Sequence, residues 1–223
     1  LAGSRESCIL FEIDRRSSAG EREVLKTGLI EILKAVRAAV DGWAPTLSRL
    51  EVALADLKLA ADHLPENEAD EAAAFLAWMG DHHFTFLGCR EYSVESSADG
   101  QLSYHIMPNT GLGILADPNV RPLGPMARKG SVPPELAEFI RSSTPLMITK
   151  STLLSKIHRP VPMDSVGVKQ FDESGRVIGE RRFIGLFTST AYSSSVMDIP
   201  VLRRKIRQVL LQSRLPEGGH DYK

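Results

Sequence analysis

A short β-prone segment near the N-terminus, Cys8–Asp14, has no partner strand near it in the sequence. The next β-prone run does not begin until Phe84, and the residues between the two have helical patterns. A lone strand leaves its backbone donors and acceptors unpaired, so it is not stable on its own. We therefore expect Cys8–Asp14 to be the last strand of a domain whose other strands lie outside this sequence. The segment should then be exposed, disordered or paired with another chain.

Helical periodicity fills the region between these two segments. Apolar residues recur at helical spacing over residues 21–41, and Gly42 and Pro45 then interrupt the pattern. After Pro45, apolar residues alternate in steps of three and four, which is typical of a coiled-coil seam. The sequence thus predicts an antiparallel helical hairpin over residues 19–65. Its apolar surface fits either the core of the same chain or a neighbouring subunit.

Strand signals dominate from Phe84 onward. Two strands come first, an irregular connection with one helix at 134–142 follows, and three strands and a final helix at 200–212 complete the pattern. The expected strands cover 84–92, 102–107, 146–149, 165–171 and 177–191. This order predicts an α+β fold in which the N-terminal helical hairpin precedes a PAS-like antiparallel five-stranded sheet with flanking helices. The PAS-like comparison is an analogy of fold and carries no function.

Capping and turn residues add detail to this outline. Asn67 is expected to cap a third helix, whose first turn holds acidic residues that suit the helix dipole. Asp99-Gly100 and Asp172–Gly175 have the composition of tight turns between strands. We therefore expect hairpins between the first two strands and between the last two.

The composition is that of a soluble globular protein. The chain has 223 residues, of which 43% are hydrophobic and 25% are charged, so it can bury a core. A net charge of −1 gives no electrostatic basis for binding nucleic acid or an anionic membrane. No apolar run is long enough to span a bilayer. Cys8 and Cys89 lack metal-ligand spacing and are interpreted as reduced thiols, which favours a cytoplasmic location.

One glycine-rich motif loosely matches a cofactor pattern. Gly111–Ala116 fits the dinucleotide pattern G-x-G-x-x-G/A, which works only where the glycine turn leads into a helix that holds the pyrophosphate. Asp117-Pro118 follows at once, and Pro122 and Pro125 come soon after, so a long helix is excluded there. We interpret the glycines as loop residues and expect no cofactor-binding residue in this chain.

Two groups of polar residues are candidate sites. Asp81–His83 resembles a metal-binding triplet, but further ligands at metal-site spacing are missing, so a helix-to-strand junction is favoured over a small metal hydrolase. Lys150, His158 and Arg159 lie near the third and fourth strands and are candidate contacts for an anion or effector. The alternative is that these three are solvated loop charges. We assign no catalytic residue and no metal ligand.

Four ordered segments of the sequence form a recognisable set. They are Phe75–Trp78 with Asp81–Gly88, Gly111–Leu115, Ile157–Asp164 with Val166–Lys169, and Gly179–Tyr192 with Ile199–Lys205. Each segment alone is modest evidence, but the set in this order resembles the large-subunit bacterial NAD-specific glutamate dehydrogenases. The resemblance covers essentially the whole chain.

The resemblance implies that the chain belongs to the long N-terminal half of such an enzyme. Residues 1–18 would be the terminal strand of a truncated ACT-like domain, 19–65 a helical hairpin, 66–212 a PAS-like α+β domain and 213–223 a linker to a missing domain. The catalytic lysine and the NAD-binding fold would lie outside this chain. The segment would then be non-catalytic, and would regulate or assemble an enzyme that converts L-glutamate, NAD and water into 2-oxoglutarate, ammonia and NADH.

The resemblance also implies the partners. They are the enzyme's own catalytic domain, other subunits of a homo-oligomer and an amino-acid effector, with no nucleic acid and no membrane. An alternative stays open, in which the chain is a small-molecule-sensing PAS-like module unrelated to a dehydrogenase.

Overall fold

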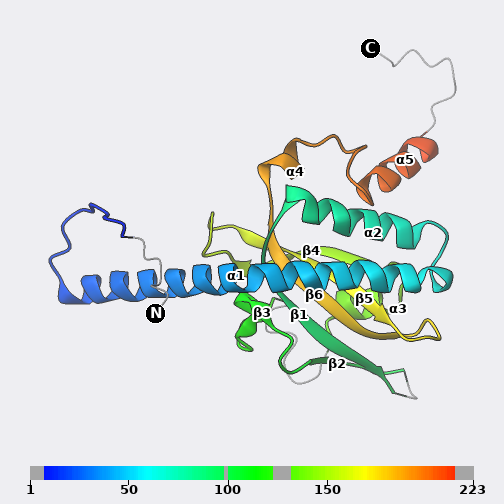
Figure 1. Cartoon of the computed structure of the whole chain (residues 1–223), viewed down its shortest axis with the longest axis horizontal. Helices are drawn as coiled ribbons and strands as arrows, with labels where there is room; N and C mark the ends of the chain where they lie inside the picture. The colour runs from blue at the N-terminus through cyan, green and yellow to red at the C-terminus, as the bar shows by residue number, and fades with distance from the viewer. Residues whose placement is uncertain (1–7, 98–99, 123–131, 214–223) are drawn as a thin grey trace, which may run out of the picture.

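One curled antiparallel sheet forms the centre of the molecule, with helices on both of its faces (Figure 1). The computed structural model describes residues 8–97, 100–122 and 132–213. Helices α1 (Ala19–Leu59) and α2 (Glu68–Trp78) cover one face, and α3 (Pro134–Arg141) packs on the other. The predicted α+β class with an antiparallel sheet is confirmed, whereas the PAS-like name stays a prediction.

The strands follow one another in a simple antiparallel order. The sheet order is β2-β1-β6-β5-β4, and the short β3 pairs with β1. Their bounds are Phe84–Ser96 for β1, Leu102–Ile106 for β2, Leu112–Gly113 for β3, Leu146–Leu154 for β4, Pro162–Phe171 for β5 and Val177–Phe187 for β6. Five of the six strands were expected from the sequence. The two-residue β3 was not, because it is too short to carry an alternating pattern.

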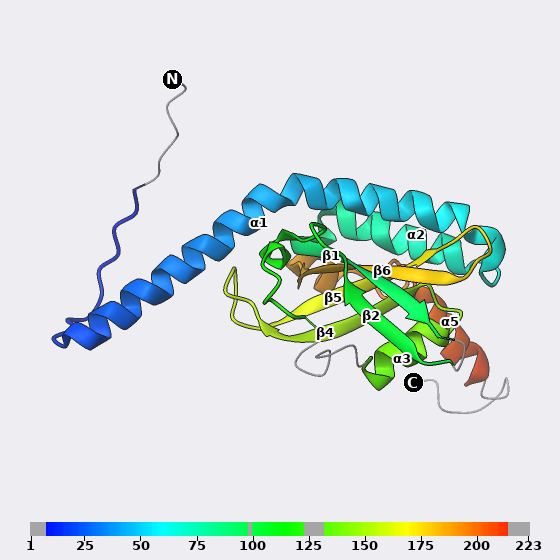
Figure 2. The same ribbon diagram turned by 90° about the horizontal axis from the view of Figure 1, so that it is seen from below.

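Helix α1 is continuous through the residues that were expected to break it. It runs for 41 residues, so the predicted hairpin over 19–65 is wrong. Burial of Leu50, Ala53 and Leu57 holds the second half of α1 against the sheet and α2, and this packing outweighs the weak helix propensity of Gly42 and Pro45. Figure 2 shows a bend where the blue part of α1 gives way to the cyan part. Pro45, which lies inside the helix and has no N–H to donate, accounts for such a bend.

An antiparallel helix pair does exist, but its turn lies later in the chain. A single turn of 3₁₀-helix, Ala61–His63, follows α1 and leads into α2, which packs against α1. Asn67 precedes α2 with a left-handed backbone (φ 64°), and its side chain makes no capping hydrogen bond. The predicted side-chain cap is therefore wrong, because this backbone conformation does not aim the Asn67 amide at the helix end.

The N-terminal residues 8–17 form no regular secondary structure, so the predicted strand at Cys8–Asp14 is wrong. All ten of these residues are exposed, as expected for a segment without a partner in its own chain. Its proposed origin in a preceding ACT-like domain stays a prediction, as do the domain boundaries inferred from the resemblance.

The remaining local signals have mixed outcomes. The turn at Asp172–Gly175 is confirmed, with Gly175 N donating to Asp172 O at 2.9 Å. Asp99 of the other predicted turn lies outside the described residues. Strand β6 ends at Phe187, earlier than expected, because the Thr188 hydroxyl accepts from Ala191 N and starts the short helix α4 (Ser189–Ser193). The final helix is confirmed as α5 (Leu202–Gln212).

Charged side chains are buried within the sheet. Arg181 on β6 donates to Glu91 Oε1 at 2.9 Å and to Asp56 Oδ2 of α1 at 3.1 Å, which ties the sheet to the helix. Successive side chains along a strand point to opposite faces of the sheet, so Glu180 and Arg182, the two neighbours of Arg181, share the other face. Arg182 and Glu180 accordingly form a fully buried ion pair on the opposite face, where Arg182 also donates to Ser165 Oγ at 2.9 Å.

Candidate functional site

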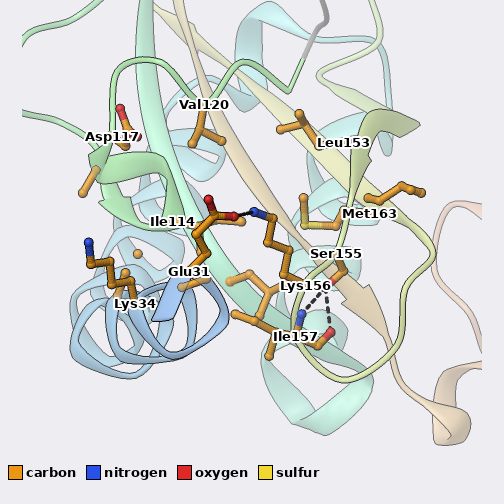
Figure 3. Close-up of a pocket in the computed structure, with 16 residues that line it drawn as sticks. Glu31, Lys34, Ile114, Asp117, Val120, Leu153, Ser155, Lys156, Ile157 and Met163 are labelled. Atoms are coloured by element: carbon orange, nitrogen blue, oxygen red, sulfur yellow. Dashed lines mark hydrogen bonds and ion pairs between the residues drawn. The ribbon is translucent and has the colours of Figure 1, made fainter. Parts of the chain in front are cut away.

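A pocket lies between the first half of α1 and the sheet, and is called the α1 pocket below (Figure 3). Its volume is about 520 Å³, which is within the usual size range of small-molecule sites. Three parts of the chain form most of it: α1, the β3 loop with its 3₁₀-turn, and the segment from the end of β4 to the start of β5, while Leu87 of β1 completes the lining. The lining residues are Glu31, Lys34, Ala35, Ala38, Leu87, Gly113, Ile114, Ala116, Asp117, Val120, Leu153, Leu154, Ser155, Lys156, Ile157 and Met163.

The walls of the α1 pocket are aliphatic and its charges balance. Leu87, Leu153 and Met163 come from the sheet, and Ile114 and Val120 come from the 3₁₀-turn and the loop that follows it. Among the described residues, no aromatic side chain lines it. The four charged lining residues are two acids and two lysines: Glu31, Asp117, Lys34 and Lys156. A ligand with an aliphatic body and both charge signs on its polar end fits this lining.

One ion pair joins α1 to the far side of the pocket. Lys156 Nζ lies 2.7 Å from Glu31 Oε2, and both side chains are more than half exposed. Figure 3 shows the pair reaching from the helix to the segment that follows β4. The hydrogen bond from Lys156 lowers the pKa of Glu31, so this carboxylate is ionised at neutral pH. An exposed pair of this kind is weak, so a ligand can displace it.

A buried arginine fixes the loop that forms one wall. Arg90 on β1 is only 1% exposed. Its Nε donates to Leu115 O at 3.0 Å, its Nη1 to Val120 O at 2.9 Å and its Nη2 to Asp117 O at 2.6 Å. Three carbonyls of the 3₁₀-turn and its following loop are thus satisfied by one guanidinium. Sequence reasoning missed Arg90, although a charged residue in the middle of an apolar strand was a signal.

The glycine motif packs backbone against backbone. Gly113 has φ +60°, and a Cβ there would lie 2.2 Å from Leu87 O of β1. Gly42 of α1 faces it, since a Cβ on Gly42 would lie 2.3 Å from Gly113 N. A three-residue 3₁₀-turn, Ile114–Ala116, follows in place of a long helix. Gly111 lies in a loop, as interpreted, whereas Gly113 is the last residue of β3, and its close packing on Gly42 and Leu87 brings α1, β3 and β1 together.

The predicted effector contacts lie outside the α1 pocket. Lys150 Nζ lies 2.5 Å from Oδ1 of the buried Asp164. Arg159 donates to Phe187 O at 3.0 Å, and its guanidinium lies 5.6 Å from the centre of the Tyr192 ring. His158 is exposed, with a left-handed backbone. Their role as anion contacts stays a prediction.

The segment Asp81–His83 forms the helix-to-strand junction that was favoured over a metal site. His83 Nδ1 lies 2.9 Å from Trp78 O, and its ring stacks on the Trp78 indole at 4.4 Å. Within residues 8–97, 100–122 and 132–213, no group of three or more His, Cys, Asp or Glu side chains is placed to hold a metal. Cys89 is buried, and burial raises the pKa of its thiol to about 12.

Comparisons with known proteins identify relatives along nearly the whole chain. The family described as "Glutamate dehydrogenase, helical motif 1" matches residues 199–223, which include α5. The NAD-specific glutamate dehydrogenase of Pseudomonas aeruginosa is 34% identical over 97% of this chain. The enzyme of the same name from Halomonas elongata is 35% identical over 99% of it. The chain is similar to a segment of the NAD-specific glutamate dehydrogenases. The resemblance predicted from the sequence is thereby confirmed.

The NAD-specific glutamate dehydrogenases are much longer than this chain. It spans 13% of the length of the Pseudomonas aeruginosa relative and 14% of the Halomonas elongata relative. A more distant relative of the same name from Mycobacterium tuberculosis is 24% identical over 89% of the chain. Among the described residues, every helix is too short or too polar to cross a bilayer.

Proposed function

We propose that this chain is a non-catalytic regulatory and assembly segment of a longer NAD-dependent glutamate dehydrogenase. The longer protein converts L-glutamate, NAD and water into 2-oxoglutarate, ammonia and NADH, with its catalytic and NAD-binding residues elsewhere in the polypeptide. Support comes from the relatives, whose similarity covers nearly all of this chain and a small part of each enzyme.

The α1 pocket is the observation that carries the regulatory part of the proposal. One wall belongs to the projecting half of α1, and the others belong to the sheet and its loops. A ligand that contacts both α1 and the sheet stabilises one orientation of the first half of α1 relative to the other orientations that this half can adopt. Regulation by a ligand requires such a difference in affinity between two arrangements. Figure 2 shows that α1 bends between its projecting half and the half that lies along the sheet, and the α1 residues that line the pocket belong to the projecting half.

An aliphatic α-amino acid fits the chemistry of the α1 pocket. Its side chain would lie against Leu87, Val120 and Met163, where water is displaced from apolar surface. Its carboxylate would pair with Lys156 and its ammonium with Glu31, in place of their present ion pair. A simple carboxylic acid lacks the ammonium and would leave Glu31 facing a like charge.

Ligand binding to the pure chain tests this assignment. We expect L-leucine or L-methionine to raise the melting temperature of the chain, and isovalerate to have little effect. Ala38→Trp fills the pocket from α1 and should abolish the shift, whereas Ala44→Trp makes the same change at an exposed position of the same helix and should not. Equal shifts with leucine and isovalerate, or a full leucine shift in Ala38→Trp, would contradict the proposal.

The absence of catalysis in the chain itself is tested separately. The pure chain, given L-glutamate and NAD, is expected to form no NADH. Glutamate-dependent NADH formation would show that the chemistry lies within these residues.

The α1 pocket also supports a second candidate function, a small-molecule sensor unrelated to a dehydrogenase. The reading frame of the natural gene separates the two. A glutamate dehydrogenase catalytic domain downstream supports the first, and an unrelated domain or a stop codon there supports the second.

A further inference from the structure

The first half of α1 carries a strip of exposed apolar side chains. Leu29 is 46% exposed, Leu33 65% and Trp43 54%. The strip consists of Leu25, Leu29, Ile32, Leu33, Val40 and Trp43. Figures 1 and 2 both show this half of α1 projecting beyond the sheet. A contiguous apolar surface of this kind on a soluble protein marks an interaction site.

The exposed strip continues a seam that is buried further along the same helix. In the second half of α1, the sheet, the β3 loop and α2 cover apolar and small residues in steps of three and four, among them Leu50, Ala53 and Leu57. The same steps lead back through Ala39, Val36, Ile32, Leu29 and Leu25. The helix therefore carries one seam, which the described residues bury only in its second half. In the first half, Ile13–Arg16 border Leu25 and Leu29 but leave both side chains exposed.

The charges at the ends of the strip point to the occupant. At intervals of four residues, the chain has Glu21, Leu25, Leu29, Leu33 and Arg37. Side chains at this spacing form one ridge on a helix. The ridge is apolar in the middle, acidic at one end and basic at the other. Within the described part of the chain, neither Glu21 nor Arg37 has an ion-pair partner.

A second copy in the opposite direction complements this ridge. With Leu29 of each copy at the centre, Leu25 of one lies beside Leu33 of the other, and Glu21 beside Arg37 at both ends. A parallel copy would place like charges together at each end. Antiparallel helices also align their dipoles favourably. Next to Leu29, a Cβ added to Gly28 would meet nothing within 4 Å, so the flank is open to an approaching helix.

We propose that two copies of this chain pair through the first halves of their α1 helices, antiparallel and centred on Leu29. Packing of two such ridges crosses the helices at about 50° in magnitude. The two sheets then lie on opposite sides of the crossing. This inference deepens the assembly part of the proposed function and rests on it, but does not depend on the α1 pocket.

Sedimentation equilibrium of the pure chain tests the dimer. The unmodified chain is expected to dimerise, and Leu29→Glu to weaken dimerisation by about tenfold or more, because an unpaired carboxylate would be buried. Thr27→Glu introduces the same charge on the opposite side of the helix and should leave the dimer intact. Circular dichroism checks that both variants keep their helix content. A monomeric unmodified chain, or equal weakening by both variants, would overturn the proposal.

Cross-linking tests the direction and register. In a Cys8→Ser background, the remaining thiol is the buried Cys89. A short bis-maleimide should link Leu29→Cys to itself, whereas Leu25→Cys and Leu33→Cys should link only when the two variants are mixed. Self-linking of all three with equal yield would show a parallel pair and overturn the antiparallel assignment.

Failure of the dimer and failure of the proposed function are distinguishable. If the chain is monomeric but still binds leucine, and Ala38→Trp abolishes that binding, only the proposed α1 pairing is contradicted. A dimeric chain that forms NADH from glutamate would remove the non-catalytic role and leave the pairing.

Discussion

At the scale of single residues, buried charges on β6 define how the sheet is held together. Glu180 and Arg182 are 1% and 0% exposed, and they neutralise each other on the face that carries α3. Tyr104 OH of β2 donates to Glu180 Oε2 at 2.8 Å, so a strand on the far side of β1 joins the same cluster. Taking both charges out of water is costly, and the pair offsets that cost only while it is complete.

Removal of one partner of the Glu180–Arg182 ion pair should therefore lower the free energy of unfolding far more than removal of both partners. Arg182→Ala leaves the Glu180 carboxylate buried without its counter-ion and should lower the free energy of unfolding by about 3–5 kcal/mol. The double variant Arg182→Met with Glu180→Gln removes both charges of the pair, and its free energy of unfolding should fall by less. Urea denaturation of both variants checks this. An equal or greater loss in the double variant would show that the charge pairing is unimportant.

Lys169 gives the protein a pH-dependent stability. Its Nζ donates to Ser142 O at 2.5 Å, just after α3, and lies 4.7 Å from the centre of the Phe139 ring. Burial lowers the pKa of Lys169 from 10.5 to about 8. Between these two values the unfolded chain binds more protons than the folded one, so stability rises with pH across this window. Below about pH 8 both states are protonated, and the contribution no longer changes.

The expected pH dependence is measured as a difference between two proteins. The unfolding free energy of the unmodified chain, minus that of Lys169→Met, should rise from pH 8 to pH 10, because the variant lacks this titration. Titrations of all other groups are common to both proteins and cancel. A difference that is flat or falls over this range would contradict the assignment.

At the scale of elements, the sequence predicted most strands and misplaced the helical turn. Strand β5 and the start of β6 were recognisable because Asp172–Gly175 separates two alternating β-prone runs. The break expected at Gly42 is absent because that glycine allows α1 to touch Gly113, a contact between residues far apart in the sequence. Local propensity carries no information about such contacts.

The α1 pocket could not be predicted from local sequence patterns either. The α1 pocket draws its walls from three distant segments, and the loop around Leu115 depends on Arg90, 25 residues earlier. The residues chosen from the sequence, Lys150, His158 and Arg159, were selected by charge alone. Two residues before His158, Lys156 lines the pocket, whereas the role of the three chosen residues as anion contacts stays a prediction.

The contrast between two glycines of α1 tests the packing argument. Gly42→Ala places a Cβ 2.3 Å from backbone atoms of β3, so the loop must move, and we expect a loss of about 1–3 kcal/mol despite the better helix propensity of alanine. Gly28→Ala meets nothing within 4 Å and should stabilise the helix by up to about 1 kcal/mol. Thermal unfolding at low protein concentration compares the two. Stabilisation by both substitutions would show that α1 does not depend on close contact with β3.

At the scale of the whole molecule, α1 is the element that connects every proposed role. Its second half is part of the core, its middle touches the β3 loop, and its first half lines the α1 pocket and carries the exposed strip. A ligand in the pocket would thus act on the same helix that pairs with a second copy. On the proposed pairing, this arrangement offers a direct route from effector binding to the contacts between subunits.

The most direct test of this account is the rate of glutamate-dependent NADH formation by the full-length polypeptide, with and without an aliphatic amino acid. The account predicts that the amino acid changes the rate of the unmodified protein and does not change the rate of the Ala38→Trp variant. An identical response in both proteins would contradict the claim that the α1 pocket is a regulatory site.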